Sequence, residues 1–178
     1  MQNQINQSAQ SHSEQQAKAQ YDSIVEFISA LDVDYDKLES LKCDVEYCVD
    51  AVNDVIETGQ SIAYEMQALY AAIEAYNEMQ DEAGEFESYD EAYEAALDNA
   101  LDVQVRSPWC DVGAEMAAGE FYILLCTGGP AVRIRGELNS GTVTRAWLEH
   151  QDWGTPWTQY YGASCDTLTQ YAQMFLPG

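Results

Sequence analysis

The chain has 178 residues, and its 31 acidic residues against 7 basic ones give a formal net charge of −24. This charge excludes ordinary binding to nucleic acid, because contacts to phosphate need Lys and Arg, and it argues against an anionic membrane surface. The partner that suits this charge is a cationic protein surface or a set of metal ions. The alternative is that the acidic residues only keep the protein well solvated.

The acidic residues are concentrated before Asp102. Residues 1–102 hold 24 of the 31 acidic residues and three of the seven basic ones, but no Arg, Pro or Trp. Residues 103–178 hold all four Arg, all four Trp and all four Pro. We therefore expect an acidic helical region over residues 14–102 and a β-rich module over residues 103–178.

The first 13 residues are polar and rich in Gln, Asn and Ser, so we expect a disordered tail. They have no basic segment followed by an apolar one and do not resemble a signal peptide. A first helix is expected over residues 14–31, with an apolar stripe of Tyr21, Ile24, Val25, Ile28 and Leu31. Asp36 and Glu39 have the spacing of a capping box for the next helix.

The strongest periodic signal follows that cap. Apolar residues alternate at spacings of three and four in an a/d heptad seam: Leu38, Leu41, Val45, Cys48, Val52, Val55, then Ile62, Met66, Leu69, Ile73 and Tyr76. Two structures fit, a single long coiled-coil helix over residues 38–83 or a helical hairpin that breaks near Gly59. The unbroken register favours the long helix.

Another helix is expected after Ser88, with Glu91 as its capping partner, and it should end near Asp102. Four segments then have the composition and alternation of strands: 103–107, 120–126, 131–138 and 142–149. We expect an antiparallel meander of three or four strands, and a short final helix capped by Ser164. The fold class is therefore α+β, with acidic helices before a small helix-covered antiparallel sheet.

No catalytic site, metal site or cofactor is predicted. Asp32, Asp34 and Asp36 imitate the start of an EF-hand loop, but Lys37 and Cys43 stand where that loop needs Gly and Glu. The five cysteines have no zinc or disulfide spacing, which is typical of reduced thiols. An enzyme would have to pair His150 with a cysteine such as Cys126, and the apolar surroundings of Cys126 favour a core residue instead.

The segment QDWGTPW, residues 151–157, is the most aromatic loop of the chain. Trp153 and Trp157 either cover the sheet or form a contact surface for a protein partner, because Trp is favoured at binding hot spots.

Two resemblances add to this interpretation. The segments CTGGPAVRIRGELN and LEHQDWGTPWTQYY, within residues 103–178, resemble a module found in proteins of bacteriophages and other mobile elements. The size and charge of the whole chain are similar to those of small acidic phage and plasmid proteins that inhibit host defence by imitating DNA, which include antirestriction proteins and anti-CRISPRs.

This likeness implies a non-enzymatic inhibitor in the cytoplasm of a host bacterium. Its partner would be a basic nucleic-acid-binding protein of a CRISPR or restriction system, without direct binding to nucleic acid or membrane, and the seam would allow a homodimer. The alternative is an oligomeric adaptor that binds a protein through the aromatic C-terminal module. The candidate partner-binding residues are Asp44, Glu46, Asp50, Asp54, Glu57, Glu65, Glu74, Glu78, Trp153 and Trp157.

Overall fold

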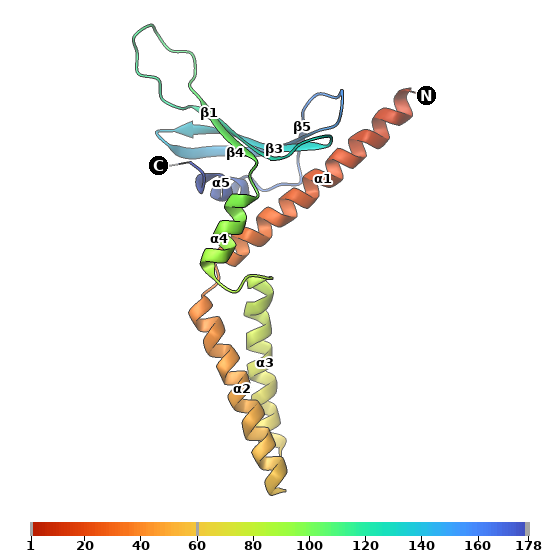
Figure 1. Ribbon diagram of the computed structural model, residues 1–178, viewed down its shortest axis with the longest axis vertical. Helices are drawn as coiled ribbons and strands as arrows, with labels where there is room; N and C mark the ends of the chain where they lie inside the picture. Colours follow the sequence, from red (N-terminus) through yellow and green to blue (C-terminus); the bar gives the residue numbers. More distant parts are fainter. Residues whose placement is uncertain (1, 60, 177–178) are drawn as a thin grey trace. The chain divides into compact units, whose positions relative to one another are not determined.

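The chain forms two compact units, seen in a computed structural model that describes residues 2–59 and 61–176, with side chains from residue 12 onward. The first unit joins Met1–Ile28 to Tyr93–Gly178, and the second is the continuous segment Ser29–Ala92. Figure 1 shows the elements in order. They are α1 (Gln2–Leu31), α2 (Tyr35–Thr58), α3 (Ala63–Ala83), α4 (Tyr89–Asp98), β1 (Asp102–Arg106), β2 (Glu120–Cys126), β3 (Ala131–Asn139), β4 (Thr142–Gln151), β5 (Thr158–Tyr160) and α5 (Cys165–Gln173).

The first unit is built on an antiparallel sheet whose five strands follow chain order, β1-β2-β3-β4-β5. The predicted α+β class is confirmed, and the four predicted strands lie within one or two residues of β1 to β4. β5 was missed, because three residues between loops carry too little alternation to predict a strand. Ser140 and Gly141 form the β3–β4 turn with positive φ angles of 51° and 84°, as the tightest hairpin turns require.

One face of this sheet carries the core. Its buried side chains alternate along the strands and include Phe121, Ile123, Val132, Ile134 and Leu148. Helices α1 and α5 lie against this face (Figure 1). Ser164 caps α5 as predicted, and the helix buries Leu168, Tyr171 and Ala172. The Tyr171 hydroxyl donates a hydrogen bond of 2.9 Å to the Ala96 carbonyl, which joins α5 to α4.

Helix α1 changes the predicted division of the chain. Its residues up to Ile28 belong to the unit that contains the sheet, whereas the sequence placed residues 14–102 together in one acidic region. Ser13, expected in a disordered tail, is buried in α1, and its Oγ lies 2.9 Å from Nδ1 of His150 on β4. This buried contact contradicts the predicted tail at Ser13. The side chains of residues 1–11 lie outside those that the structure describes.

The second unit is a helical hairpin. Gly59 ends α2 in the left-handed conformation, with φ 72°, and its N–H reaches the carbonyls of Val55 and Ile56. The single long helix is therefore wrong, and the hairpin alternative is confirmed. The Asp36–Glu39 capping box is also wrong, because the Asp34 carboxylate accepts the Lys37 N–H at 3.0 Å and starts the helix earlier.

The core of the hairpin lies at the end where the chain enters and leaves it. Val33, Leu38 and Ala83 are buried there, with Tyr76 and Met79 packed against them. Among the described residues from 39 to 82, Val52 alone is buried, and the other seam residues keep part of their surface in solvent. Two helices side by side make a single layer, and that layer does not close a core of its own.

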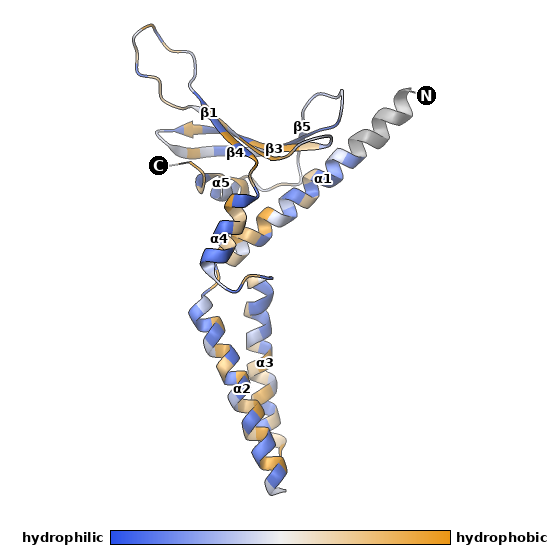
Figure 2. Ribbon diagram, in the orientation of Figure 1, coloured by the Kyte–Doolittle hydropathy of each residue, from blue (hydrophilic) through white to orange (hydrophobic). Residues whose placement is uncertain are grey.

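Helix α4 begins as predicted. The Glu91 N–H donates to Ser88 Oγ at 3.2 Å, and the Glu91 carboxylate accepts the Glu87 N–H at 2.8 Å. The helix ends at Asp98 rather than near Asp102, which opens β1. Figure 2 shows hydrophilic residues along both helices of the hairpin. In the described part of the chain, no helix combines the length and apolar character needed to cross a bilayer.

Candidate binding surfaces

The hairpin unit carries most of the charge of the protein. Residues 29–92 contain 18 acidic residues and two lysines, so the unit has a net charge of −16. Of the described ion pairs, one involves these residues, an exposed contact of 3.7 Å between Lys42 and Glu39. Neither α2 nor α3 has a basic residue in its last turn. The acids are therefore largely uncompensated within the unit.

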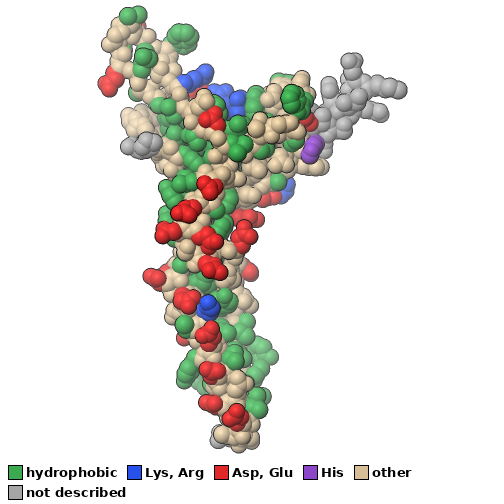
Figure 3. Space-filling view, in the orientation of Figure 1, with side chains coloured by type: hydrophobic (Ala, Val, Ile, Leu, Met, Phe, Trp, Pro, Cys, Tyr) green, Lys and Arg blue, Asp and Glu red, His purple; other side chains and the backbone are tan. Residues whose placement is uncertain are grey.

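The acidic candidates of α2 form a stripe. Glu46, Asp50, Asp54 and Glu57 are exposed, and spacings of four, four and three residues place them on the side of α2 opposite the seam. Figure 3 shows acidic side chains following one another along the hairpin in this way. Asp44 on α2 is also exposed, at the border between this stripe and the seam.

Helix α3 distributes its acids differently. Glu74 and Glu78 are exposed, and so are Asp81 and Glu82, which follow them. Glu65 differs from the other candidates because it is half-buried, and its Oε2 has no hydrogen-bond partner among the described residues. The acidic surface of α3 thus lies in its second half.

The two candidate tryptophans occupy different places in the first unit. Trp153 is 80% exposed, and its Nε1 donates to the Gly128 carbonyl at 2.8 Å. A side chain at Gly129 would collide with the Trp153 ring, so the two loops fit together only with glycine there. A cavity of about 340 Å³ lies between the loops. Trp153 therefore presents one face of its ring to solvent from an anchored position.

Trp157 lies under an arginine. The Arg133 guanidinium stands 3.9 Å from the centre of the Trp157 ring and also bonds Glu149 at 2.7 Å. Stacking of this kind fixes a guanidinium while leaving some of its N–H donors available. Trp157 is half-buried, so its role in a contact would be to position Arg133.

All four arginines of the chain share the face of the sheet opposite the core. In the strand register, Arg106 stands opposite Glu120, Arg133 opposite Glu149, Arg135 opposite Trp147, and Arg145 opposite Glu137. Alternation along 131–138 placed Arg133 and Arg135 on one face from the sequence. The alignment with Arg106 and Arg145 was missed, because it depends on strand pairing.

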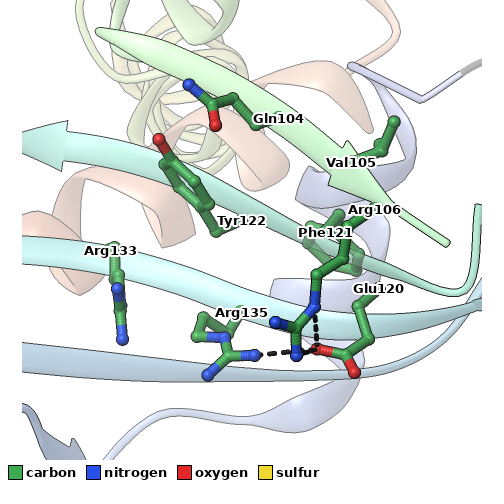
Figure 4. Close-up of a pocket in the computed structure, with 8 residues that line it drawn as sticks. All are labelled: Gln104, Val105, Arg106, Glu120, Phe121, Tyr122, Arg133 and Arg135. Atoms are coloured by element: carbon green, nitrogen blue, oxygen red, sulfur yellow. Dashed lines mark hydrogen bonds and ion pairs between the residues drawn. The ribbon is translucent and has the colours of Figure 1, made fainter. Parts of the chain in front are cut away.

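A recess of about 260 Å³ lies on this arginine face, next to the edge strand β1. Figure 4 shows the residues that line it. The Glu120 carboxylate bridges two guanidinium groups there, accepting from Arg106 Nη2 at 2.6 Å and Arg135 Nη2 at 2.9 Å. Tyr122 lines the same recess and donates to Asp102 at 2.7 Å. Because carboxylates balance the arginines, this face suits a protein contact better than a free anion.

The structure does not bring Cys126 and His150 together. Cys126 stands opposite Val132, and Val132 opposite His150, so one whole strand separates the thiol from the imidazole, a spacing of about 10 Å. Burial raises the pKa of the Cys126 thiol and lowers the pKa of His150. Both groups are kept neutral, whereas a thiolate nucleophile needs the opposite shifts. Within the described residues, no cluster of three or more His, Cys, Asp or Glu is placed to hold a metal ion.

Comparison of the chain with protein-family models, curated proteins and solved structures finds no match.

Proposed function

We propose that the protein is an inhibitor that binds a nucleic-acid-targeting defence complex of a host bacterium, a CRISPR effector or a restriction enzyme. The acidic outer faces of α2 and α3 occupy the cationic groove that normally receives nucleic acid. The inhibitor acts by stoichiometric occupation, and no turnover is involved. The observation that carries the proposal is the net charge of −16 on residues 29–92, with the acidic residues of α2 aligned away from its seam.

The charge spacing of the hairpin supports this proposal. Helices α2 and α3 together carry 12 acidic residues and two lysines, a net −10. The 24 residues of α2 span about 36 Å, because an α-helix rises about 1.5 Å per residue. The hairpin therefore presents about one negative charge per 3.6 Å. One strand of DNA has a phosphate about every 3.4 Å, and the duplex one about every 1.7 Å.

Exposed charges of one sign mainly accelerate association, and salt screens them. We therefore expect fast binding that weakens as the ionic strength rises, since the screening length falls from about 10 Å at 0.1 M to about 3 Å at 1 M salt. Nucleic acid should compete for the same groove.

The test is capture from bacterial lysate on immobilised protein, with elution by duplex DNA and, separately, by a salt gradient. Three baits are compared. They are the wild type, a stripe variant (Glu46→Gln, Asp50→Asn, Asp54→Asn, Glu57→Gln), and a control with the same charge change on the first unit (Glu26→Gln, Asp98→Asn, Asp111→Asn, Glu115→Gln).

The proposal predicts that a nuclease or CRISPR subunit leaves the wild-type and control baits when DNA is added, and that the stripe variant retains much less of it. The purified target should then lose cleavage activity in proportion to added inhibitor. A captured protein that DNA does not displace, or equal capture by the stripe and control variants, would refute the proposal.

A second candidate is the adaptor, which the exposed and anchored Trp153 favours. In that case Trp153→Ala should abolish capture of the partner, while the stripe variant should bind normally. The same three-bait experiment, with Trp153→Ala as a fourth bait, separates the two functions.

A further inference from the structure

The sheet of the first unit ends in two edge strands that differ in how open they are. At one edge, β5 has three residues and begins two residues after Pro156. At the other edge, β1 has five residues without Pro or Lys, and it pairs with β2 without a register shift. Short strands, proline, lysine and bulges are the usual means by which a protein keeps a sheet edge from pairing. The edge at β5 is protected in this way, and the edge at β1 is not.

The outer edge of β1 presents a regular row of backbone donors and acceptors. Alternate residues of an edge strand direct their N–H and C=O groups away from the sheet. Of the described strands, β2 is the one paired with β1, and Figure 4 shows β1 as the outermost strand at the recess. Four of its five residues are exposed. A further strand could therefore bind here through main-chain hydrogen bonds.

The β1 side chains on the core side of the sheet are apolar. Val103 stands opposite Ile123, and Val105 stands opposite Phe121. Both β2 residues are buried, but Val103 remains 36% and Val105 53% exposed. The apolar layer is therefore incompletely covered at this edge. An added strand with apolar residues opposite the two valines would extend the core and bury them.

On the arginine face, the two ends of β1 carry opposite charges that are held in place. Arg106 donates to Glu120 Oε2 through Nε at 3.0 Å and Nη2 at 2.6 Å. Asp102 accepts through Oδ2 from Gln104 at 2.9 Å and from Tyr122 at 2.7 Å. For Arg106 Nη1 and Asp102 Oδ1, no hydrogen bond to another described residue is seen. Each end of β1 therefore has a fixed charge with one donor or acceptor still unused.

These features define the segment that fits the edge. Directly opposite residues of an antiparallel pair have Cβ atoms about 5 Å apart, so an acid suits the position opposite Arg106 and a base the position opposite Asp102. With apolar residues opposite the valines, the pattern is acid, apolar, any residue, apolar, base. β1 itself has this pattern, DVQVR, but each copy of the chain has a net charge of −24, and two copies repel each other. A segment of a less acidic protein is favoured instead.

We propose that β1 binds an extended segment of a partner protein, with this pattern, as a sixth and antiparallel strand of the sheet. The recess of about 260 Å³ beside Gln104 and Arg106 leaves room for the acidic side chain of that segment. The proposal goes beyond the inhibitor function and does not rest on the acidic stripe of α2. The stripe variant should therefore bind the segment as the wild type does.

The probe is a synthetic peptide, SEVTVKS, whose Glu and Lys lie opposite Arg106 and Asp102 in an antiparallel pair. Its control is SKVTVES, which has the same composition but places like charges opposite each other. Each peptide is titrated to about 2 mM into the isotope-labelled full chain, and the amide signals are followed by NMR to give a dissociation constant. The wild type is also diluted without peptide over a wide range of concentration.

Two pairs of variants test the apolar row and the charged end. Val105→Lys interrupts the apolar row, and Val112→Lys adds the same charge at a fully exposed residue of the β1–β2 loop. Arg106→Gln removes the charge at the end of β1, and Arg145→Gln removes an arginine of the same sheet face on β4. The amide spectrum of each variant shows whether it is folded.

We expect SEVTVKS to shift the amide signals of residues 102–106 and SKVTVES to bind more weakly. Val105→Lys should weaken binding of SEVTVKS at least about 10-fold, because a charge meets apolar side chains. Arg106→Gln should weaken it about 2–5-fold, as for an exposed ion pair. The two control variants should bind like the wild type.

The absence of shifts in residues 102–106 would overturn the proposal, and so would equal binding of the two peptides or of the two valine variants. If the signals of residues 102–106 change on dilution without peptide, a second copy occupies the edge, and the proposed foreign segment is wrong.

Discussion

Neutralising the acidic stripe of α2 should stabilise the protein while it removes binding. The stripe variant changes Glu46, Asp50, Asp54 and Glu57 to their amides. In the native helix these four side chains are neighbours of like charge, and Glu57 lies in the last turn, where the negative end of the helix dipole also repels it. The arrangement is unfavourable for the helix itself, as expected of residues kept for a contact rather than for folding.

The size of the effect follows from the spacing. Two like-charged pairs are four residues apart and one is three apart, and each costs about 0.2–0.5 kcal/mol. The repulsion of Glu57 by the helix end adds about 0.3–1 kcal/mol. All four side chains are exposed, so screening keeps the sum near its lower end. We expect a gain of about 1–2 kcal/mol at low salt.

Thermal unfolding followed by circular dichroism at 20 mM and 1 M NaCl measures this gain. The Tm of the stripe variant should exceed that of the wild type by about 2–8 °C at 20 mM NaCl, and the difference should shrink at 1 M. A Tm that is unchanged or lower at 20 mM NaCl would show that these carboxylates make stabilising contacts, and the reasoning would fail.

Three further predictions concern the first unit. Burial raises the pKa of Tyr171 to about 12, so the folded state keeps a proton that the unfolded state releases near pH 10. The folded wild type therefore loses stability as the pH rises from about 10 to 12, and at pH 11 this loss is about 1.4 kcal/mol. At pH 7, Tyr171→Phe should lower the free energy of unfolding by about 1–3 kcal/mol, because the Ala96 carbonyl loses its donor. Phenylalanine does not ionise, so urea titrations should show the difference in stability from the wild type closing towards pH 11, and a difference that does not change with pH would contradict this. Gly136→Ala should destabilise the sheet by about 1–3 kcal/mol, because the new methyl group meets the backbone carbonyl oxygen of Arg145 on the paired strand and the Phe121 ring. An unchanged urea midpoint would contradict this prediction. Burial lowers the pKa of His150, so below pH 6.5 the unfolded state binds a proton that the folded state does not. Below that pH the wild type should lose stability relative to His150→Gln, and free energies of unfolding that change in parallel with pH in the two proteins would contradict this prediction.

The sheet was predictable from the sequence because its strands obey local rules. In the segment 120–126, every second side chain is buried, and turns rich in Gly, Asn and Ser separate the strands. Ser164 and the Ser88–Glu91 pair marked their helices for the same reason, since a cap depends on residues within one turn. None of these features needs information from distant parts of the chain.

The hairpin was predicted less well because the heptad register was read as evidence of continuity. Each helix needs its own a/d seam against the other, and the short connection around Gly59 happens to preserve the phase. The residue that decides between the two structures is Gly59, because it adopts a φ of 72° that most other residues disfavour.

Long-range features were beyond the sequence. The contact between Ser13 and His150 joins residues 137 positions apart, and nothing in the polar segment around Ser13 indicates it. The clustering of arginines depends on the register of four strands, which alternation within one strand does not reveal.

The hairpin is also an interruption of another unit. The chain leaves the sheet-bearing unit through α1, makes the hairpin, and returns through α4. Evolution could therefore lengthen or shorten α2 and α3 together by whole heptads, about 10.5 Å each, without changing any strand of the sheet.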